Sequence, residues 1–157
     1  MITLLKNIIG MGPKEIEVFK VKTYPVLNDI DGLRETAYNI DEAIKRVFLG
    51  HAKLALVGCG TSGASLMTAV SMISNIDTCL VTKKSEENTS HRPKYSLSLH
   101  DYHHLIVVDD RIETGDTMYR ISSIIPSSKV KMVCAVNANE KREQLIQLFP
   151  NCKYFCY

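Results

Sequence analysis

The sequence lacks long apolar runs, an excess of charge of either sign and any paired-cysteine motif. No stretch approaches the ~18 consecutive apolar residues of a membrane-spanning helix. The apolar start, MITLLKNIIGMG, has Lys6 in its middle and neither a basic leader nor a small-residue cleavage site, which argues against a targeting segment. The net charge of +2 is too small for a general nucleic-acid binder. These absences predict a cytoplasmic protein that binds neither membranes nor nucleic acid.

The five cysteines are odd in number and include no C-x-x-C pair. Cys79, Cys134 and Cys156 fall in apolar segments that are typical of strands or strand ends. Buried thiols in a reducing compartment explain this pattern better than a disulfide framework does.

No internal repeat, low-complexity tract or inter-domain linker interrupts the chain. At 157 residues and 45% apolar content, the chain is long enough to bury a core as one domain, residues 1–157.

Short apolar runs alternate with helical patterns along the chain. The predicted strands are 54–57, 79–82, 105–108 and 130–136, and the predicted helices are 31–49, 64–75, 117–125 and 138–149. We expect two further short strands, an antiparallel or edge strand within 15–27 and a last edge strand at 154–157. This alternation predicts an α/β fold with a mostly parallel sheet covered on both faces, which binds ligands beyond the carboxyl ends of its strands.

A glycine-rich turn follows the first of the apolar runs, and its letters fit G-x-G-x-x-G. Its residues are Gly58, Cys59, Gly60, Thr61, Ser62 and Gly63. A dinucleotide site needs an acidic residue about 20 positions on, where this chain has Lys83 and Lys84, which suit a 2′-phosphate instead. A P-loop is excluded because Gly-Lys-Ser/Thr is missing. The turn also resembles the phosphosugar-binding loop of sugar isomerase domains, and a tight turn without a ligand is a further alternative.

Residues 105–117, LIVVDDRIETGDT, place two carboxylates and a hydroxyl-rich turn after an apolar strand. Backbone N–H groups of 113–117 are expected to converge at a helix start, which favours an anion. The carboxylates of the pair can accept hydrogen bonds from sugar hydroxyls or hold Mg²⁺ through water. One site therefore fits a phosphate and a ribose diol together. Its predicted residues are Asp109, Asp110, Thr114, Gly115, Asp116 and Thr117.

This stretch resembles the phosphoribosyl pyrophosphate (PRPP) motif of type I phosphoribosyltransferases over thirteen residues without a gap. The resemblance implies the fold of that family, with a core at about 30–140 and a small hood from 1–30 and 138–157. It also implies that Asp109 and Asp110 hold Mg²⁺ and that Gly58–Gly63 is the pyrophosphate loop. No basic residue stands in that loop, so backbone N–H groups and the Thr61 and Ser62 hydroxyls are expected to make the contact.

The polar segment 83–100 matches the family's mobile catalytic loop in position and character, and Lys83, Lys84 and His91 are the catalytic residues that this match implies. Glu113 stands where purine-salvage members carry an aspartate, which implies a general base and a 6-oxopurine acceptor. Against this, residues 130–139 lack the lysine that those enzymes use, and Asn137 or Asn139 is the candidate substitute.

The resemblance therefore implies an enzyme that transfers the 5-phosphoribosyl group from PRPP to a nucleobase, as a homodimer. Two alternatives stay open, a non-catalytic regulatory protein of the same fold that binds PRPP or a nucleotide, and an orotate-type pyrimidine transferase.

Overall fold

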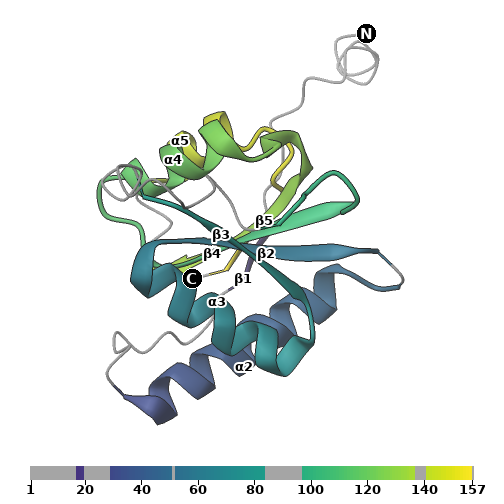
Figure 1. The fold of residues 1–157 in the computed structure, drawn as a ribbon, viewed down its shortest axis with the longest axis vertical. Coiled ribbons are helices and arrows are strands. Elements are labelled where there is room, and N and C mark those ends of the chain that lie inside the picture. The colour runs from purple at the N-terminus through teal and green to yellow at the C-terminus, as the bar shows by residue number, and fades with distance from the viewer. Residues whose placement is uncertain (1–16, 20–28, 51, 84–96, 137–140, 157) are drawn as a thin grey trace, which may run out of the picture.

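The computed structural model describes residues 17–19, 29–50, 52–83, 97–136 and 141–156. They form one six-stranded sheet between two layers of helices (Figure 1). All strand pairs are parallel, in the order β1-β6-β5-β4-β2-β3. The strands are β1 (Glu17–Phe19), β2 (Leu54–Cys59), β3 (Asp77–Val81), β4 (His104–Arg111), β5 (Val130–Val136) and β6 (Tyr154–Cys156).

Helices of the described residues cover both faces of the sheet (Figure 1). On one face lie α2 (Ile30–Val47) and α3 (Gly60–Ser74), and on the other lie α4 (Asp116–Ile124) and α5 (Arg142–Leu148), with a 3₁₀ turn at Ser127–Lys129. Strand side chains alternate between the two cores. Leu56 and Ile106 pack with α2 and α3, whereas Val57 and Val107 pack with α4 and α5.

The predicted parallel sheet and its flanking helices are confirmed, and one prediction about the edges is wrong. The strand at β1 is an edge strand, which is one of the two predicted alternatives, and it runs parallel to β6. The strand at β6 is not an edge strand, because it lies between β1 and β5. Phe155 and Cys156 are both buried, as suits a strand covered on both faces.

The predicted helix 64–75 begins four residues earlier than expected, at Gly60, so the glycine-rich turn forms the first turn of α3. The predicted helix 31–49 begins at Ile30, where Asp29 caps it by accepting a hydrogen bond from the Asp31 N–H at 3.1 Å. The first residues of the predicted helix 138–149 lie outside the described residues, which place α5 at Arg142–Leu148.

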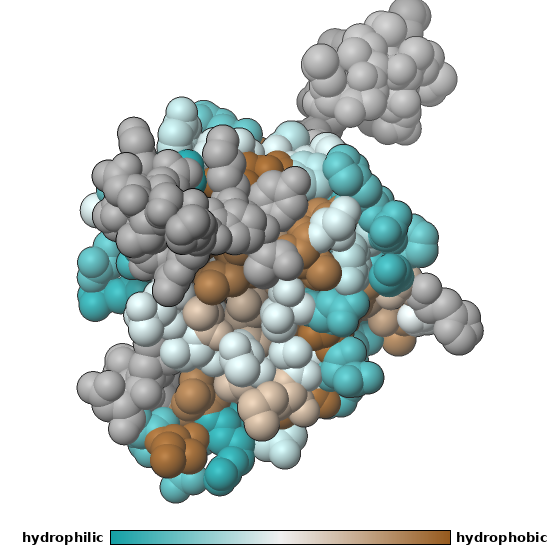
Figure 2. Space-filling model, viewed as in Figure 1, coloured by the Kyte–Doolittle hydropathy of each residue, from teal (hydrophilic) through white to brown (hydrophobic). Residues whose placement is uncertain are grey.

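α3 is unusual in carrying no charged side chain along its 15 residues. Its exposed residues include Thr61, Ser65 and Met72, and the surface over this helix is mostly white and tan in Figure 2. Among the described residues, no helix is both long and apolar enough to cross a membrane. The five cysteines, all of them described, are buried and form no disulfide, as predicted.

Candidate phosphoribosyl site

The two predicted carboxylates lie in an irregularity at the carboxyl end of β4. Val108 pairs with Cys134 and Arg111 with Val136, so β4 uses three residue steps where β5 uses two. This extra residue falls at Asp109 and Asp110, which therefore lie in a bulge within β4. The sequence pattern had indicated a position after the strand. A bulge redirects the side chains that it carries, and bulges are frequent beside binding sites.

Asp109 is buried, with 4% of its surface exposed. Its Oδ1 accepts a hydrogen bond from the Asp110 N–H at 3.0 Å. Burial raises the pKa of the Asp109 carboxyl to about 8, and the neighbouring Asp110 carboxylate adds to the rise, while Lys83 opposes it. The ionised form of Asp109 is therefore unfavourable in the protein alone, and a cation beside it would stabilise that form.

The hydroxyl-rich turn leads directly into α4, with Gly115 as the residue that precedes the helix. Gly115 has a φ of +89°, which only glycine adopts without strain. Thr114 Oγ1 donates to Asp116 Oδ2 at 3.0 Å and accepts from the Asp116 N–H at 3.3 Å. The Asp116 carboxylate is thereby turned toward Thr114, and the amide dipoles of α4 favour an anion at its start.

Two cavities meet at this turn, since Thr114 and Thr117 line both. The smaller holds about 300 Å³ and is lined by Asp109, Asp110, Arg111, Ile112, Glu113, Thr114, Gly115, Thr117 and Met118. The larger holds about 590 Å³, and its described lining residues are Cys59, Lys83, Thr114, Asp116, Thr117, Tyr119, Arg120 and Ser123. Together they are large enough for a sugar phosphate and a second group attached to it.

The glycine-rich turn meets the end of β2 at a very short distance. A Cβ atom on Gly58 would lie 2.9 Å from the Gly63 carbonyl oxygen, and one on Gly63 would lie 3.5 Å from Asp109 Oδ1. Glycine at Gly58 is thus required for the strand and the helix to approach this closely, and the approach brings the start of α3 beside the carboxylate pair.

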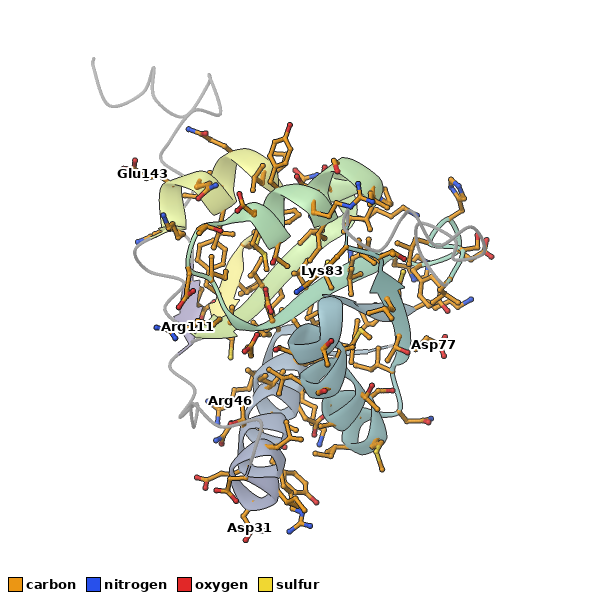
Figure 3. All side chains as sticks on the ribbon, turned by 60° about the vertical axis from the view of Figure 1, so that its left-hand side comes forward. Asp31, Arg46, Asp77, Lys83, Arg111 and Glu143 are labelled. Atoms are coloured by element: carbon orange, nitrogen blue, oxygen red, sulfur yellow. The ribbon has the colours of Figure 1, made fainter. Side chains whose placement is uncertain are left out.

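Lys83 supplies the positive charge that the glycine-rich turn itself lacks. It follows β3, and its Nζ would lie 2.8 Å from a Cβ atom on Gly60, whose φ is +68°. Figure 3 shows the Lys83 side chain directed toward the start of α3. Lys83 is the first residue of the predicted catalytic loop, and the structure places its side chain against the glycine-rich turn.

The sequence matches no protein-family profile and no curated protein. Its structure is similar to that of adenine phosphoribosyltransferase from Saccharomyces cerevisiae, with a TM-score of 0.60 and 13% identity over 84% of this chain and 82% of that one. For orotate phosphoribosyltransferase from Francisella tularensis the TM-score is 0.60, with 16% identity over 82% of this chain and 67% of that one. A phosphoribosyltransferase from Corynebacterium diphtheriae gives 0.58, with 14% identity over 82% and 78%.

The chain has the type I phosphoribosyltransferase fold. Within this fold, the smaller cavity brings together the six residues predicted from LIVVDDRIETGDT except Asp116, which lines the larger cavity. Cys59 and Lys83 also line the larger cavity, while Lys84 and His91 lie outside the described residues, as do Asn137 and Asn139.

Glu113 lines the smaller cavity of the phosphoribosyltransferase fold, but its side chain is paired. Arg111 Nε lies 3.0 Å from Glu113 Oε1, and the two side chains are 60% and 63% exposed. Arg111 was not among the predicted site residues. Its position at the end of β4, two residues before Glu113, was the signal that could have identified it.

The two carboxylates provide the kind of oxygen donors that fit a magnesium ion. Among the described residues, no group of three or more histidine, cysteine, aspartate or glutamate side chains could hold a metal ion. Mg²⁺ is commonly bound through one or two carboxylates, with waters and substrate phosphates completing the shell. Asp109 and Asp110 provide this limited donor set, and a cation beside them would favour the ionised form of Asp109, whose pKa is raised by burial and by Asp110.

Proposed function

We propose that this protein transfers the 5-phosphoribosyl group from PRPP to a nucleobase and releases pyrophosphate. The observation that carries the proposal is the smaller cavity, where the bulged carboxylate pair and the hydroxyl-rich start of α4 line one space. A ribose 5-phosphate needs both features in one cavity, because its diol and its phosphate are parts of one small molecule. The structural similarity to adenine and orotate phosphoribosyltransferases supports the same chemistry.

In this proposal the α4 start and the Thr114 and Thr117 hydroxyls bind the 5-phosphate, and Asp109 and Asp110 accept hydrogen bonds from the ribose hydroxyls. Mg²⁺ held by the two aspartates would offset negative charge on the pyrophosphate. The glycine-rich turn and the Lys83 ammonium bind the leaving pyrophosphate, and Lys84 and His91 from the predicted catalytic loop act on the same group. Closure of that loop would exclude the water that hydrolyses PRPP.

For the acceptor we propose a 6-oxopurine, with Glu113 as the general base. Glu113 lines the smaller cavity together with the carboxylate pair, and Arg111 lies beside its carboxylate at the end of β4. An orotate-type acceptor is the competing proposal, supported by the similarity to the Francisella tularensis enzyme.

The second candidate function is a regulatory protein that binds PRPP or a nucleotide without turnover. The specific observation in its favour is that the glycine-rich turn has no basic residue of its own and is covered at Gly60 by Lys83. A sensor should bind PRPP equally well after Lys83→Ala, whereas an enzyme should lose turnover.

We further propose a homodimer in the cytoplasm. The uncharged, partly exposed α3 surface supports the first, since two copies related by a twofold axis can pack such a surface without like-charge repulsion. The buried cysteines without disulfides support a reducing compartment. Sedimentation velocity tests the dimer.

The deciding experiment measures pyrophosphate release from PRPP and Mg²⁺ with hypoxanthine, guanine, xanthine, adenine, orotate and uracil in turn. Release that depends on one base supports the enzyme and names its acceptor. No pyrophosphate release with any of the six bases, with PRPP binding still detected by calorimetry, would favour the sensor. An absence of PRPP binding would contradict both proposals.

A further inference from the structure

The phosphate-binding turn has a neighbour on α5 that the sequence did not single out. A Cβ atom on Gly115 would lie 2.5 Å from Gln144 Nε2, 2.6 Å from Oε1 and 2.8 Å from Cδ. Nε2 and Oε1 are the nearest atoms and Cδ lies behind them, so the end of the Gln144 carboxamide points toward this position. The Gln144 side chain therefore occupies the space that any larger residue at 115 would need.

Gln144 touches the turn from the side of α5. Gly115 lines the smaller cavity, and all described lining residues of that cavity fall within 109–118. The turn is thus held between the cavity and α5, which lies beside α4 in both Figure 1 and Figure 3. Buried Met118 of α4 and Leu145 of α5 belong to one core cluster. The packing of α5 on α4 therefore sets the position of Gln144 relative to the turn.

The chemical character of this contact matters because an anion is expected at the turn. A glutamine presents a neutral group of the same shape as glutamate, whereas a carboxylate here would stand directly behind a phosphate. Like charges on one turn repel more strongly in a partly buried site than in water. The acidic Glu143, on the same helix, is exposed instead.

We propose that Gln144 is a positioning residue for the 5-phosphate. It holds Gly115 in its positive-φ conformation, so that the turn is already shaped for the phosphate, and it does so without adding negative charge. Ordering the turn before binding reduces the entropy that binding must overcome. This inference rests on the proposed function, since it assigns a role at the same phosphate site.

The test compares Q144E and Q144M with Q147E as the matched control. Gln147 lies on the same helix and is exposed, so Q147E adds the same charge away from the turn. Binding of ribose 5-phosphate is measured by calorimetry at low and high salt, and KM for PRPP and kcat are measured with the accepted base. Thermal unfolding confirms that each variant is folded.

We expect Q144E to weaken ribose 5-phosphate binding about tenfold or more, with a smaller loss at high salt. Q144M, which keeps the volume but not the polar amide end, should weaken it by about threefold. Both should raise KM for PRPP and leave kcat within about twofold, because the turn binds the phosphate in substrate and transition state alike. Q147E should match the wild type.

Equal binding by Q144E and Q147E would overturn the inference, as would a fall in kcat with KM unchanged. If Q144E fails to fold, Q144M decides alone, and unchanged affinity in Q144M contradicts the role. A wild-type chain that binds neither ribose 5-phosphate nor PRPP would instead overturn the proposed function, and this inference with it.

Discussion

Asp109 should make the protein less stable than it would be with a neutral side chain at this position. Burial raises its pKa from 3.8 to about 8. At about 1.4 kcal/mol per pH unit, this shift sets a ceiling of roughly 6 kcal/mol on the stability lost when the buried carboxyl ionises. A group whose pKa is raised by folding stabilises the protein below its unfolded pKa, so the loss develops as the pH rises from about 4 to about 8.

Asp109→Asn removes the charge and keeps the shape. The amide oxygen can still accept the Asp110 N–H hydrogen bond, but the amide also has to be desolvated, so only part of the ceiling is recovered. We expect a gain of about 2 kcal/mol in the free energy of unfolding, which corresponds to about 4–8 °C in Tm for a domain of this size. The gain should be full near pH 9 and mostly absent near pH 5.

The assay is thermal unfolding of wild type, D109N and D110N across this pH range, with and without Mg²⁺ and PRPP. Asp110 is only partly buried, so D110N should raise Tm less than D109N does. Mg²⁺ with PRPP should stabilise the wild type and not D109N, because the ligand set is broken. A D109N protein that is less stable than wild type near pH 9, or equally shifted at both ends of the range, would refute the charge argument.

Three further outcomes are expected. Glu113→Gln should lower kcat with a 6-oxopurine about 10²-fold or more and leave KM for PRPP unchanged; full activity in this variant would exclude the general-base role. Lys129→Met should lower the free energy of unfolding in urea by about 2 kcal/mol, because Nζ donates to three backbone carbonyl oxygens at 2.7, 2.9 and 3.2 Å, whereas exposed Lys153→Met should change little. Tyr102→Phe removes a 2.6 Å hydrogen bond to Asp77 that raises the Tyr102 pKa to about 12. It should cost about 1–2 kcal/mol at neutral pH, and the difference in Tm from wild type should shrink between about pH 10 and pH 12.

The local patterns of the sequence predicted most of the fold, because each depends on neighbours along the chain. Continuous apolar runs indicated buried parallel strands, and the strand at Val130–Val136 has the predicted bounds. The edge strands could not be predicted in the same way. The sequence of a three-residue strand such as β6 does not indicate which strands lie beside it. Its interior position depends on pairing with β1, which comes from the other end of the chain.

The position of Lys83 shows why the site was predicted only in part. From the sequence it is the first residue of a long polar segment. In the structure Cys59 pairs with Val81, and this register brings the residues after β3 level with the start of α3. Gln144 depends on a longer-range arrangement still, the packing of α5 on α4. Sequence spacing fixes neither relationship, because both depend on non-local contacts.

Contacts that stabilise the fold lie at the amino end of the sheet, and the candidate binding residues lie at its carboxyl end. At the amino end, Lys129 and the Tyr102–Asp77 hydrogen bond fasten the loop before β4. The carboxyl end has a bulge and a buried carboxylate, which are unfavourable to the folded chain alone, and two helix starts whose positive φ requires glycine. Such features persist where a binding site requires them. Substitutions at the amino end should therefore lower the unfolding free energy and spare ligand binding, whereas those at the carboxyl end should reduce binding and in cases such as Asp109→Asn raise stability.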